Sequence, residues 1–263
     1  MQERHSNRTQ YFNEQSITTN RYVIPYINSI RKIEPGTKVL EIGCGEGGNL
    51  LPFVDMGCSV VGIELLRHQF ENAEKFYENH PNKNLLTLIC SDIYHIDPKS
   101  LPSFDVIFMK DVIEHIPDQS RFLGFLRQFL SPSGVIFFGF PPWRMPFGGH
   151  QQVCNSILSK VPYFHILPVP IYKAILKLFG ESEAAVADFL DVKSTGLSII
   201  RFHRIIDQNQ YQVLKETYWL INPNYETKFG LKPRILPNWI KIPWLCDFYT
   251  TAIYCVIAKK YIC

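Results

Sequence analysis

The sequence predicts an α/β fold in which a mostly parallel sheet of seven strands carries helices on both faces. Five short apolar runs alternate with segments whose apolar residues recur at helical spacing, which is typical of strands joined by helical crossovers. The runs are continuous rather than alternating, so these strands are expected to be buried on both faces, as in a parallel sheet. The first run ends in a turn with four glycines in six positions: Gly43, Gly45, Gly47 and Gly48.

Composition and charge exclude several classes of protein. The chain has 263 residues, of which 46% are hydrophobic and 19% charged, and this is an ordinary globular composition. A net charge of +3 without a run of basic residues gives no reason to expect nucleic-acid binding. The sequence predicts no transmembrane helix and no secretory signal. Seven cysteines without CxxC spacing predict buried thiols in the cytoplasm and no metal site.

We expect a single domain over residues 1–263 with an N-terminal helical cap over 1–34. Residues 1 to about 18 are polar and are expected to be mobile or loosely docked. The spacing of apolar residues from Tyr22 to Ile30 predicts the first helix. The predicted strands are 38–42, 59–64, 85–90, 104–109, 135–140, 211–220 and 252–258. The other predicted helices are about 47–56, 66–79, 118–129 and 194–207.

The regular alternation stops after the fifth predicted strand, and two features complete the fold. Residues 141–193 contain no clear strand and predict a helical lid, a substrate-specificity insertion. The lid either packs on its own core or forms an apolar pocket or membrane-contacting surface, and Lys173 and Lys177 would suit an anionic interface. The last two strands lack a helix between them, so we expect them to pair antiparallel at one sheet edge.

The glycine turn predicts a nucleotide-like ligand. Gly43, Gly45 and Gly48 match GxGxxG, which alone permits a nicotinamide or flavin dinucleotide. Glu41 lies inside the preceding strand, which is unusual for a dinucleotide fingerprint. Glu64 ends the second strand, where a carboxylate accepts hydrogen bonds from ribose hydroxyls.

These stretches together resemble the class I S-adenosylmethionine-dependent methyltransferases. The resemblance rests on VLEIGCGEGG, the Glu64 strand end, Ser91-Asp92-Ile93 and FDVIFMKDVIEHI, and it covers about residues 20–140. It implies a Rossmann-like sheet with an antiparallel last strand. The stretch ending in Glu114-His115 is similar to the small-molecule branch that includes ubiquinone-biosynthesis O-methyltransferases.

The resemblance also implies which residues bind S-adenosylmethionine. Near the methionine part it places Glu41, Gly43, Cys44, Gly45, Gly47 and Lys110. Around the adenosine it places Glu64, Leu65, Asp92 and Ile93. An entry helix closes over the cofactor in the ubiquinone enzymes, and by this likeness we expect Arg21 to pair with the cofactor carboxylate, unless it is a solvated helix charge.

Methyl transfer to a hydroxyl also needs a base, and two histidines are candidates. His115 follows the fourth strand, although it could instead cap or orient its loop. His150 lies beside two glycines just beyond the fifth strand, at the sheet edge where substrates enter, and could be a base, a substrate contact or a plain loop histidine.

The sequence therefore predicts methyl transfer from S-adenosylmethionine to a small molecule, with oxygen as the acceptor atom and an aromatic or lipid-like substrate. Two alternatives stay open. A nicotinamide-dependent reductase on a Rossmann sheet is disfavoured by Glu41 and by the antiparallel last strand. A non-catalytic cofactor-binding protein on the same fold would keep Glu64 and Asp92 without turnover.

Overall fold

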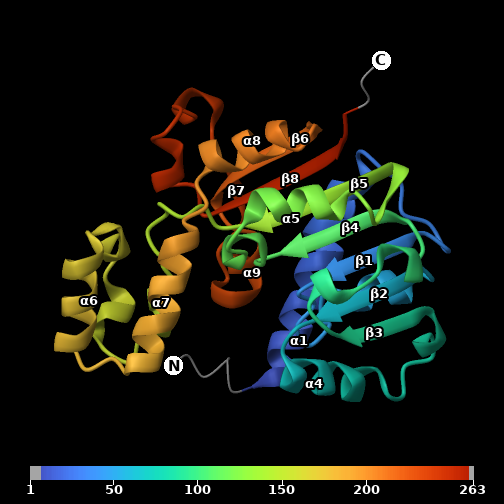
Figure 1. Cartoon of the computed structure of the whole chain (residues 1–263), viewed down its shortest axis with the longest axis horizontal. Helices are drawn as coiled ribbons and strands as arrows, with labels where there is room; N and C mark the ends of the chain where they lie inside the picture. Colours follow the sequence, from blue (N-terminus) through green and yellow to red (C-terminus); the bar gives the residue numbers. More distant parts are fainter. Residues whose placement is uncertain (1–6, 261–263) are drawn as a thin grey trace.

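The structure is a computed structural model that describes residues 7–260. One sheet runs through the described chain in the order β3-β2-β1-β4-β5-β8-β6-β7 (Figure 1). β1 to β5 are parallel, and β8 is antiparallel to both of its neighbours, β5 and β6. The strands are β1 (Lys38–Ile42), β2 (Ser59–Glu64), β3 (Leu86–Cys90), β4 (Phe104–Lys110), β5 (Leu130–Phe140), β6 (Tyr211–Ile221), β7 (Arg234–Ile235) and β8 (Ala252–Lys259).

The mostly parallel sheet and the antiparallel last strand are confirmed, but the count of seven strands is wrong. The additional strand is β7, which has only two residues and pairs antiparallel with the end of β6 at the sheet edge. A two-residue strand is too short to show a period in the sequence, so no pattern could have predicted it.

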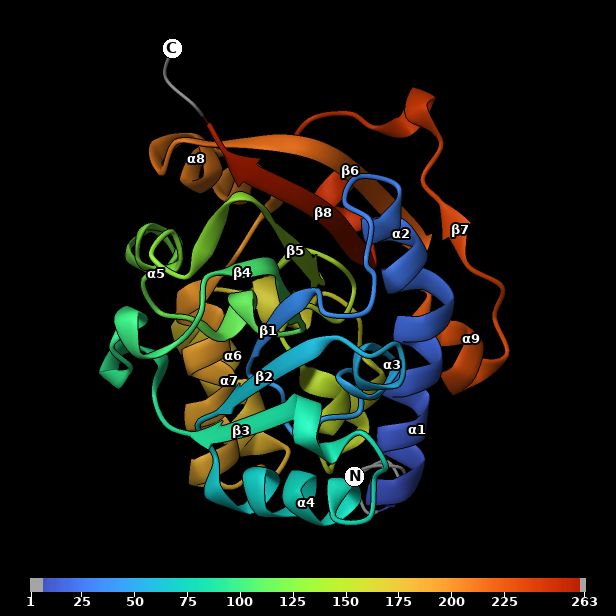
Figure 2. The same cartoon turned by 90° about the vertical axis from the view of Figure 1, so that its right-hand side faces the viewer.

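Helices cover both faces of the sheet (Figure 2). They are α1 (Arg8–Thr18), α2 (Ile24–Asn28), α3 (Leu51–Asp55), α4 (Arg67–Tyr77), α5 (Gln119–Leu126), α6 (Val169–Leu178), α7 (Glu183–Thr195), α8 (Ile199–Gln208) and α9 (Asn224–Phe229). A π-helical turn, η2 (Thr19–Val23), joins α1 to α2. The 3-10 turns are η3 (Lys83–Leu85), η4 (Ile93–His95), η5 (Pro98–Ser100), η6 (Ile113–His115), η7 (Gln151–Val153), η8 (Ile157–Lys160), η9 (Phe164–Ile166), η10 (Asn238–Ile240) and η11 (Cys246–Phe248).

Two apolar cores lie on opposite faces of the sheet. Successive residues of β1 point to opposite faces, so Leu40 and Ile42 join the core under α5 and α8. Val39 joins the other core, which α1, α2 and α3 cover. Glu41 has the same parity as Val39 and is fully buried on that face. A carboxyl group is therefore built into the core directly before the glycine turn.

Three predicted boundaries need correction. The stretch expected to be mobile up to residue 18 contains α1, which begins at Arg8 and buries Phe12 against the ring of Phe76, with ring centroids 4.3 Å apart. The helix expected at 47–56 is only α3, because residues 43–50 form consecutive turns. The helix expected at 194–207 starts at Ile199, since Ser198 caps it.

The segment after β5 is helical, as predicted. Between β5 and α8 the described residues form α6, α7 and the 3-10 turns η7, η8 and η9, with no strand. Seven buried side chains form a separate core here: Cys154, Leu158, Phe164, Tyr172, Leu176, Val186 and Phe189. Figure 1 shows α6 and α7 beyond the sheet edge at which β4 ends. This helical segment thus has an apolar core of its own, separate from the two cores of the sheet.

Within residues 7–260, no helix has both the length and the apolar character needed to cross a membrane. Six cysteines are described, and all are free thiols. Five of them are buried: Cys44, Cys58, Cys154, Cys246 and Cys255. The seventh, Cys263, lies outside the described residues.

Candidate active site

The glycine turn after β1 needs glycine for two separate reasons. Gly43, Gly45 and Gly47 have φ angles of 67°, 56° and 83°, a region in which side chains are strained. Neighbours also leave no room: an added Cβ would lie 2.8 Å from Val112 at Gly43 and 2.9 Å from Tyr77 at Gly47. The turn therefore presents bare backbone at the carboxyl end of β1, as its sequence predicts.

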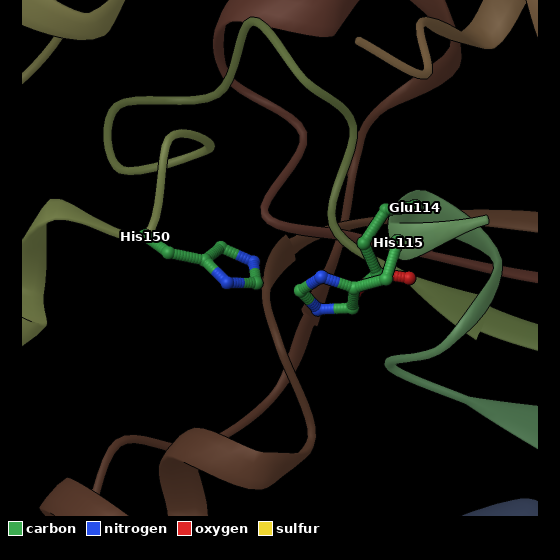
Figure 3. Close-up of side chains that lie close together, drawn as sticks. All are labelled: Glu114, His115 and His150. Carbon is green, nitrogen blue, oxygen red and sulfur yellow. The ribbon is translucent and has the colours of Figure 1, made fainter. Parts of the chain in front are cut away.

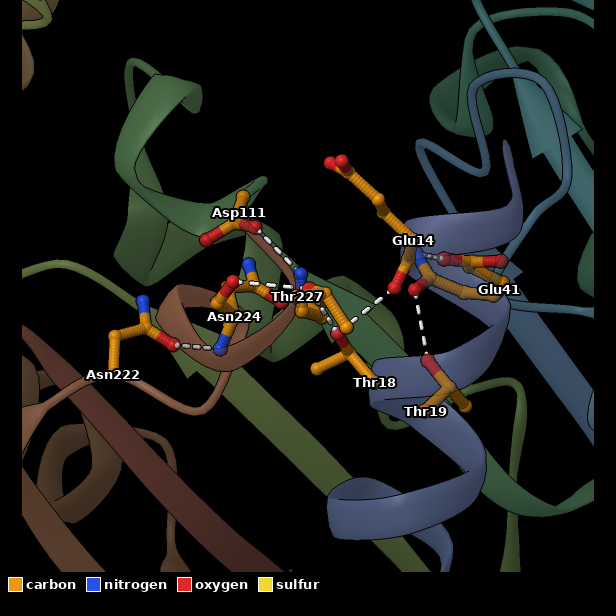
Figure 4. A network of polar contacts seen from close by, with 10 residues as sticks. Glu14, Thr18, Thr19, Glu41, Asp111, Asn222, Asn224 and Thr227 are labelled. Atoms are coloured by element: carbon orange, nitrogen blue, oxygen red, sulfur yellow. Dashed lines mark hydrogen bonds and ion pairs between the residues drawn. The ribbon is translucent and has the colours of Figure 1, made fainter. Parts of the chain in front are cut away.

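Glu41 is held at this turn by a chain of hydrogen bonds (Figure 4). The Asn49 amide donates to Glu41 Oε1 over 3.0 Å, and the Thr19 hydroxyl donates to Asn49 Oδ1 over 2.8 Å. Glu41 Oε2 has no hydrogen-bond partner among the described residues. Burial raises the pKa of Glu41 well above its usual range, and the Asn49 bond opposes this shift. The raised pKa favours the neutral carboxyl group in the free protein, and a cationic group beside the unpartnered oxygen would favour the charged carboxylate again.

The second strand end is tied to the turn by its carboxylate. Glu64 Oε2 accepts a hydrogen bond from the Gly45 N–H over 2.7 Å, and Oε1 accepts one from Leu66 N–H over 2.8 Å. Each carboxylate oxygen can accept a further bond, so Glu64 keeps acceptor capacity for a ligand hydroxyl. Leu65, next to it, is 64% exposed and offers an apolar surface.

The third strand ends in a short cap. Asp92 Oδ1 accepts a hydrogen bond from Tyr94 N–H over 2.9 Å and begins η4, while Ile93 is buried. Cys44 is also buried, and its Sγ lies 3.0 Å from the position that a Cβ on Gly62 would take. The structure thus places Cys44 against β2 and Asp92 at the end of β3.

Lys110 and Asp111 form an ion pair at the end of β4. Lys110 Nζ lies 2.8 Å from Asp111 Oδ2, and the lysine side chain is only 4% exposed. Burial acts to raise the pKa of Asp111, but the ammonium groups of Lys110 and Lys228 outweigh it and lower the pKa. Asp111 has a φ of 58°, and a non-glycine residue in this region costs about 1–3 kcal/mol. Such strain is common at functional sites.

The two predicted histidines face each other across the end of β4 (Figure 3). The rings of His115 and His150 meet edge to face at an interplanar angle of 70°, with centroids 4.8 Å apart. Burial lowers the pKa of both imidazoles, and that of His150 falls to about 4. Both rings are therefore neutral at pH 7, and each has one nitrogen free to accept a proton or bind a cation.

Glu114 completes this cluster. Its carboxyl group is buried, and neither oxygen has a hydrogen-bond partner among the described residues. Burial, together with the charge of Asp111, raises the pKa of Glu114 well above its usual range. One ligand atom from each of Glu114, His115 and His150 lies within 4.8 Å of the others, so these three side chains can hold a cation. Cysteine spacing gave no sign of this set.

The residues on either side of His150, Gly149 and Gln151, are both held against His165. The imidazole of His165 is fully buried, with Nε2 2.8 Å from the Trp143 carbonyl oxygen and Nδ1 3.2 Å from Gln151 Nε2. Nε2 therefore donates to the carbonyl, and Nδ1 accepts from the amide. A Cβ on Gly149 would lie 2.3 Å from His165 Cβ, so only glycine allows this approach.

A cavity of about 360 Å³ opens between these groups. Its lining includes Asp111, Glu114, His115 and His150, and it continues onto side chains that sequence analysis missed: Tyr11 from α1, and Asn222, Asn224, Tyr225 and Lys228 at and before α9. A signal for part of this second group existed, because Asn222 directly follows β6, as Ser91 and Asp92 follow β3.

The Arg21 side chain, on η2, is paired with a residue of α9. It is 60% exposed, and Nη1 is 3.4 Å from Glu226 Oε2 on α9. The Tyr22 hydroxyl donates to the same oxygen over 2.6 Å. In this structure both residues hold η2 against α9.

These observations fit S-adenosylmethionine at the turn. Glu41 offers a partnerless carboxylate oxygen, and the glycines form a cradle that a Cβ would fill. Glu64 and Leu65 offer a hydroxyl acceptor and an apolar surface beside it. A cationic amino acid joined to a nucleoside matches this order of groups.

A comparison with known proteins identifies relatives of the N-terminal part. A family model described as "Methyltransferase domain" matches residues 13–151. The ubiquinone biosynthesis O-methyltransferase of Rhodopseudomonas palustris (strain BisB5) is 32% identical over 103 residues, 38% of this chain and 38% of that protein. The mitochondrial ubiquinone biosynthesis O-methyltransferase of Homo sapiens is 31% identical over 104 residues, 39% of this chain and 28% of that protein. The match thus spans less than half the length of these relatives.

Solved structures show the same fold over nearly the whole chain. The plantazolicin methyltransferase BpumL, in complex with a triazolic desmethylPZN analog and SAH, has a TM-score of 0.57 at 16% identity, covering 98% of this chain and 89% of that one. The magnesium protoporphyrin IX methyltransferase of Synechocystis PCC 6803 with bound SAH has a TM-score of 0.54 at 14% identity, covering 94% and 84%.

Proposed function

The chain belongs to the methyltransferase domain family, and on that premise we propose that it transfers a methyl group from S-adenosylmethionine to an oxygen of a small-molecule acceptor. The main support is the arrangement of two adjacent sites. Glu41 presents a free carboxylate oxygen at the glycine turn, and a cavity with two neutral imidazoles opens at the end of β4. The first suits the cofactor and the second suits an acceptor hydroxyl.

In this proposal the protein binds, aligns and takes a proton. The cofactor, when bound, supplies a methyl group already activated on a sulfonium. Glu41 binds the cofactor's ammonium group, Glu64 its ribose, and Asp92 with Ile93 its adenine. Lys110 lies along the methionine arm and holds Asp111 in place. Alignment of the acceptor and exclusion of water then account for most of the rate.

His150 is the proposed base. It is neutral at pH 7 because its pKa is lowered to about 4, and it lines the cavity with His115 against it. His115 packs edge to face against the His150 ring and restricts its orientation, and His150 takes the acceptor's proton. General-base catalysis contributes about 10²–10⁴-fold to the rate and is strongest when the pKa of the base lies near the working pH, so a pKa of about 4 favours the lower end of this range.

Glu114 supports a second way of activating the acceptor, in which the cluster binds a divalent cation. A buried carboxyl group without any partner is costly, and an ion is a common explanation for one. A cation held by Glu114, His115 and His150 would lower the pKa of a bound hydroxyl directly. Dialysis against EDTA separates the two: the base mechanism keeps full turnover, whereas the cation mechanism loses it and recovers with added Mg²⁺, Mn²⁺ or Zn²⁺.

The acceptor is proposed to carry an apolar or aromatic part. The cavity of about 360 Å³ shares Phe147, Tyr225 and Phe229 with a neighbouring cavity of about 580 Å³ that extends toward Leu231. A polar head at the histidines and an apolar body along these rings would fill both. Residues 141–193 then act as the specificity lid, and residues 1–34 as the cap over the cofactor.

We also propose that the lid contacts a membrane surface and that the protein acts in the cytoplasm. On α6, Val169, Ile171 and Leu178 are 49%, 50% and 81% exposed, beside Lys173 and Lys177, of which Lys177 pairs with Glu183 Oε1 over 2.6 Å. Free thiols throughout the described chain support a reducing compartment. Sedimentation with phosphatidylglycerol vesicles tests the contact: binding that is absent from phosphatidylcholine vesicles supports it, and no binding to either contradicts it.

Two measurements test the proposed function. Calorimetric titration with S-adenosylhomocysteine and with NADH distinguishes a methyltransferase from a nicotinamide-dependent reductase, because only the proposed class binds the former. Transfer of a radiolabelled methyl group to a panel of phenols and alcohols then distinguishes an enzyme from a non-catalytic protein. Binding of NADH alone would overturn the proposal.

A further inference from the structure

A second cavity lies away from the candidate active site, between α8, β6 and the loop that carries η10 and η11. It has a volume of about 370 Å³ and shares no lining residue with the cavity at the histidines. Its lining combines three apolar side chains, Ile199, Ile200 and Pro243, with an exposed indole, Trp244. A volume of this size and a mostly apolar wall are typical of small-molecule sites.

The cationic side chains that line this cavity outnumber the anionic ones by one when its histidine is protonated. His203 Nε2 lies 2.9 Å from Glu216 Oε1, and the Tyr218 hydroxyl lies 3.4 Å from the same nitrogen. When His203 is protonated, its imidazolium and the Glu216 carboxylate neutralise each other. Lys241 also lines the cavity, and its ammonium lies 5.2 Å from the centroid of the Tyr218 ring. Among the described residues, Lys241 has no carboxylate within ion-pair distance.

Trp244 is held in an uncommon conformation at the rim. Its φ is 63°, and its side chain is 58% exposed although it is a large apolar group. An aromatic residue with positive φ stores backbone strain, and such strain gathers at ligand-binding positions. The strained loop thus presents an indole face beside the leftover charge of Lys241.

We propose that this cavity is a second binding site, for a small aromatic carboxylate. The ring of such a ligand lies against Trp244 and Pro243, and its carboxylate pairs with Lys241. The apolar walls of Ile199 and Ile200 exclude water from the ring. The site is separate from methyl transfer, so the inference does not depend on the proposed function.

Three ligands of matched shape test the charge requirement: 3-phenylpropionate, 3-phenylpropanamide and 3-phenylpropylamine. The titrations use the full chain at pH 6, where His203 is protonated because its hydrogen bond with Glu216 raises its pKa. The indole N–H signals in NMR spectra report binding, with Trp244→Phe assigning one of the four. We expect 3-phenylpropionate to shift the Trp244 signal with a Kd on the order of 1 mM. The amide binds at least fivefold more weakly, and the amine not at all.

Variants then locate the site. Lys241→Gln is expected to weaken 3-phenylpropionate binding at least fivefold, whereas Lys173→Gln, an exposed lysine on α6, leaves it unchanged. His150→Ala and saturating S-adenosylhomocysteine leave it unchanged too. The proposal is overturned if wild-type protein shows no shift at Trp244, if the three ligands bind equally, or if binding is lost in His150→Ala. The ligand series on wild-type protein decides the matter even if Lys241→Gln fails to fold.

Discussion

Replacement of Glu41 by glutamine separates the cost of burying this carboxyl group from its use in binding. Glutamine keeps the shape and the oxygen that accepts from Asn49 over 3.0 Å, but it removes the charge. The Glu41 side chain is 0% accessible, and one of its oxygens has no hydrogen-bond partner among the described residues. Its charged form therefore carries the full free-energy cost of desolvation. The free protein should therefore lose nothing by the change, while cofactor binding should weaken.

The expected size follows from the interaction removed. A hydrogen bond to a charged group contributes about 1.5–3 kcal/mol, so Glu41→Gln should raise the Kd for S-adenosylhomocysteine by about 10- to 150-fold. Unfolding should show the opposite sign, with a melting temperature equal to or above that of wild type. Calorimetric titration measures the first quantity and a thermal melt the second. Glu71→Gln, an exposed carboxylate paired with Arg67 on α4, is the matched control and should change neither.

The pH dependence gives an independent check. The pKa of Glu41 is raised in the folded protein, so between the unfolded value of about 4.3 and the folded value the native state binds more protons than the unfolded state. Stability contributed by the protonated group is therefore present at low pH and falls as pH rises through this window. Glu41→Gln removes that fall, and the difference in stability between variant and wild type should grow with pH. Unchanged affinity for S-adenosylhomocysteine, or a lower melting temperature at pH 7, would refute the reasoning.

Two further predictions concern the loop of His150. His150→Ala should reduce turnover about 10²–10⁴-fold with unchanged affinity for S-adenosylhomocysteine. Wild-type activity should fall as pH drops toward 4, where the imidazole becomes protonated. Equal turnover in the variant rules out the catalytic role. Gly149→Ala places a methyl group 2.3 Å from His165 Cβ and should lower the free energy of unfolding by about 1–3 kcal/mol, measured by denaturant titration. Gly180→Ala has the opposite cause of strain, because nothing lies within 4 Å but the φ of 79° strains a side chain, so it measures backbone strain without a contact; unchanged stability of Gly149→Ala would refute the contact with His165.

The parts of the molecule that the sequence predicted well are those set by local patterns. β1, β2 and β4 are continuous apolar runs, and each lies within one residue of its predicted bounds. The same holds for Glu64 and Asp92, since residues at the carboxyl ends of parallel strands meet at one sheet edge. His115 and His150 were placed near that edge by the same rule, and the structure brings their rings to 4.8 Å.

What sequence analysis missed depends on contacts between distant segments. Asn222 to Lys228 enter the cavity only because β6 pairs antiparallel with β8 and so ends at the same sheet edge as β5. α1 has a polar sequence because much of its surface faces solvent, and its burial of Phe12 depends on Phe76 from α4. The Arg21 side chain contacts Glu226, which is 205 residues away in the sequence. Apart from the position of Asn222 directly after β6, no pattern within a single stretch contains this information.

The helix formed by α1 and η2 contacts both the proposed cofactor site and α9 beside the acceptor cavity. Its π-helical turn explains how adjacent residues reach both. Thr18 and Thr19 are adjacent, yet their hydroxyls contact different elements: Thr18 Oγ1 lies 3.5 Å from Thr227 Oγ1 on α9, and Thr19 donates to Asn49 at the glycine turn (Figure 4). A π-turn widens the helix locally and is often found at functional sites. A shift of α9 on acceptor binding would therefore change the position of Glu41 through the hydroxyl contacts of Thr18 and Thr19. Binding of cofactor and acceptor should then be coupled, and Thr19→Val should weaken that coupling more than it weakens folding.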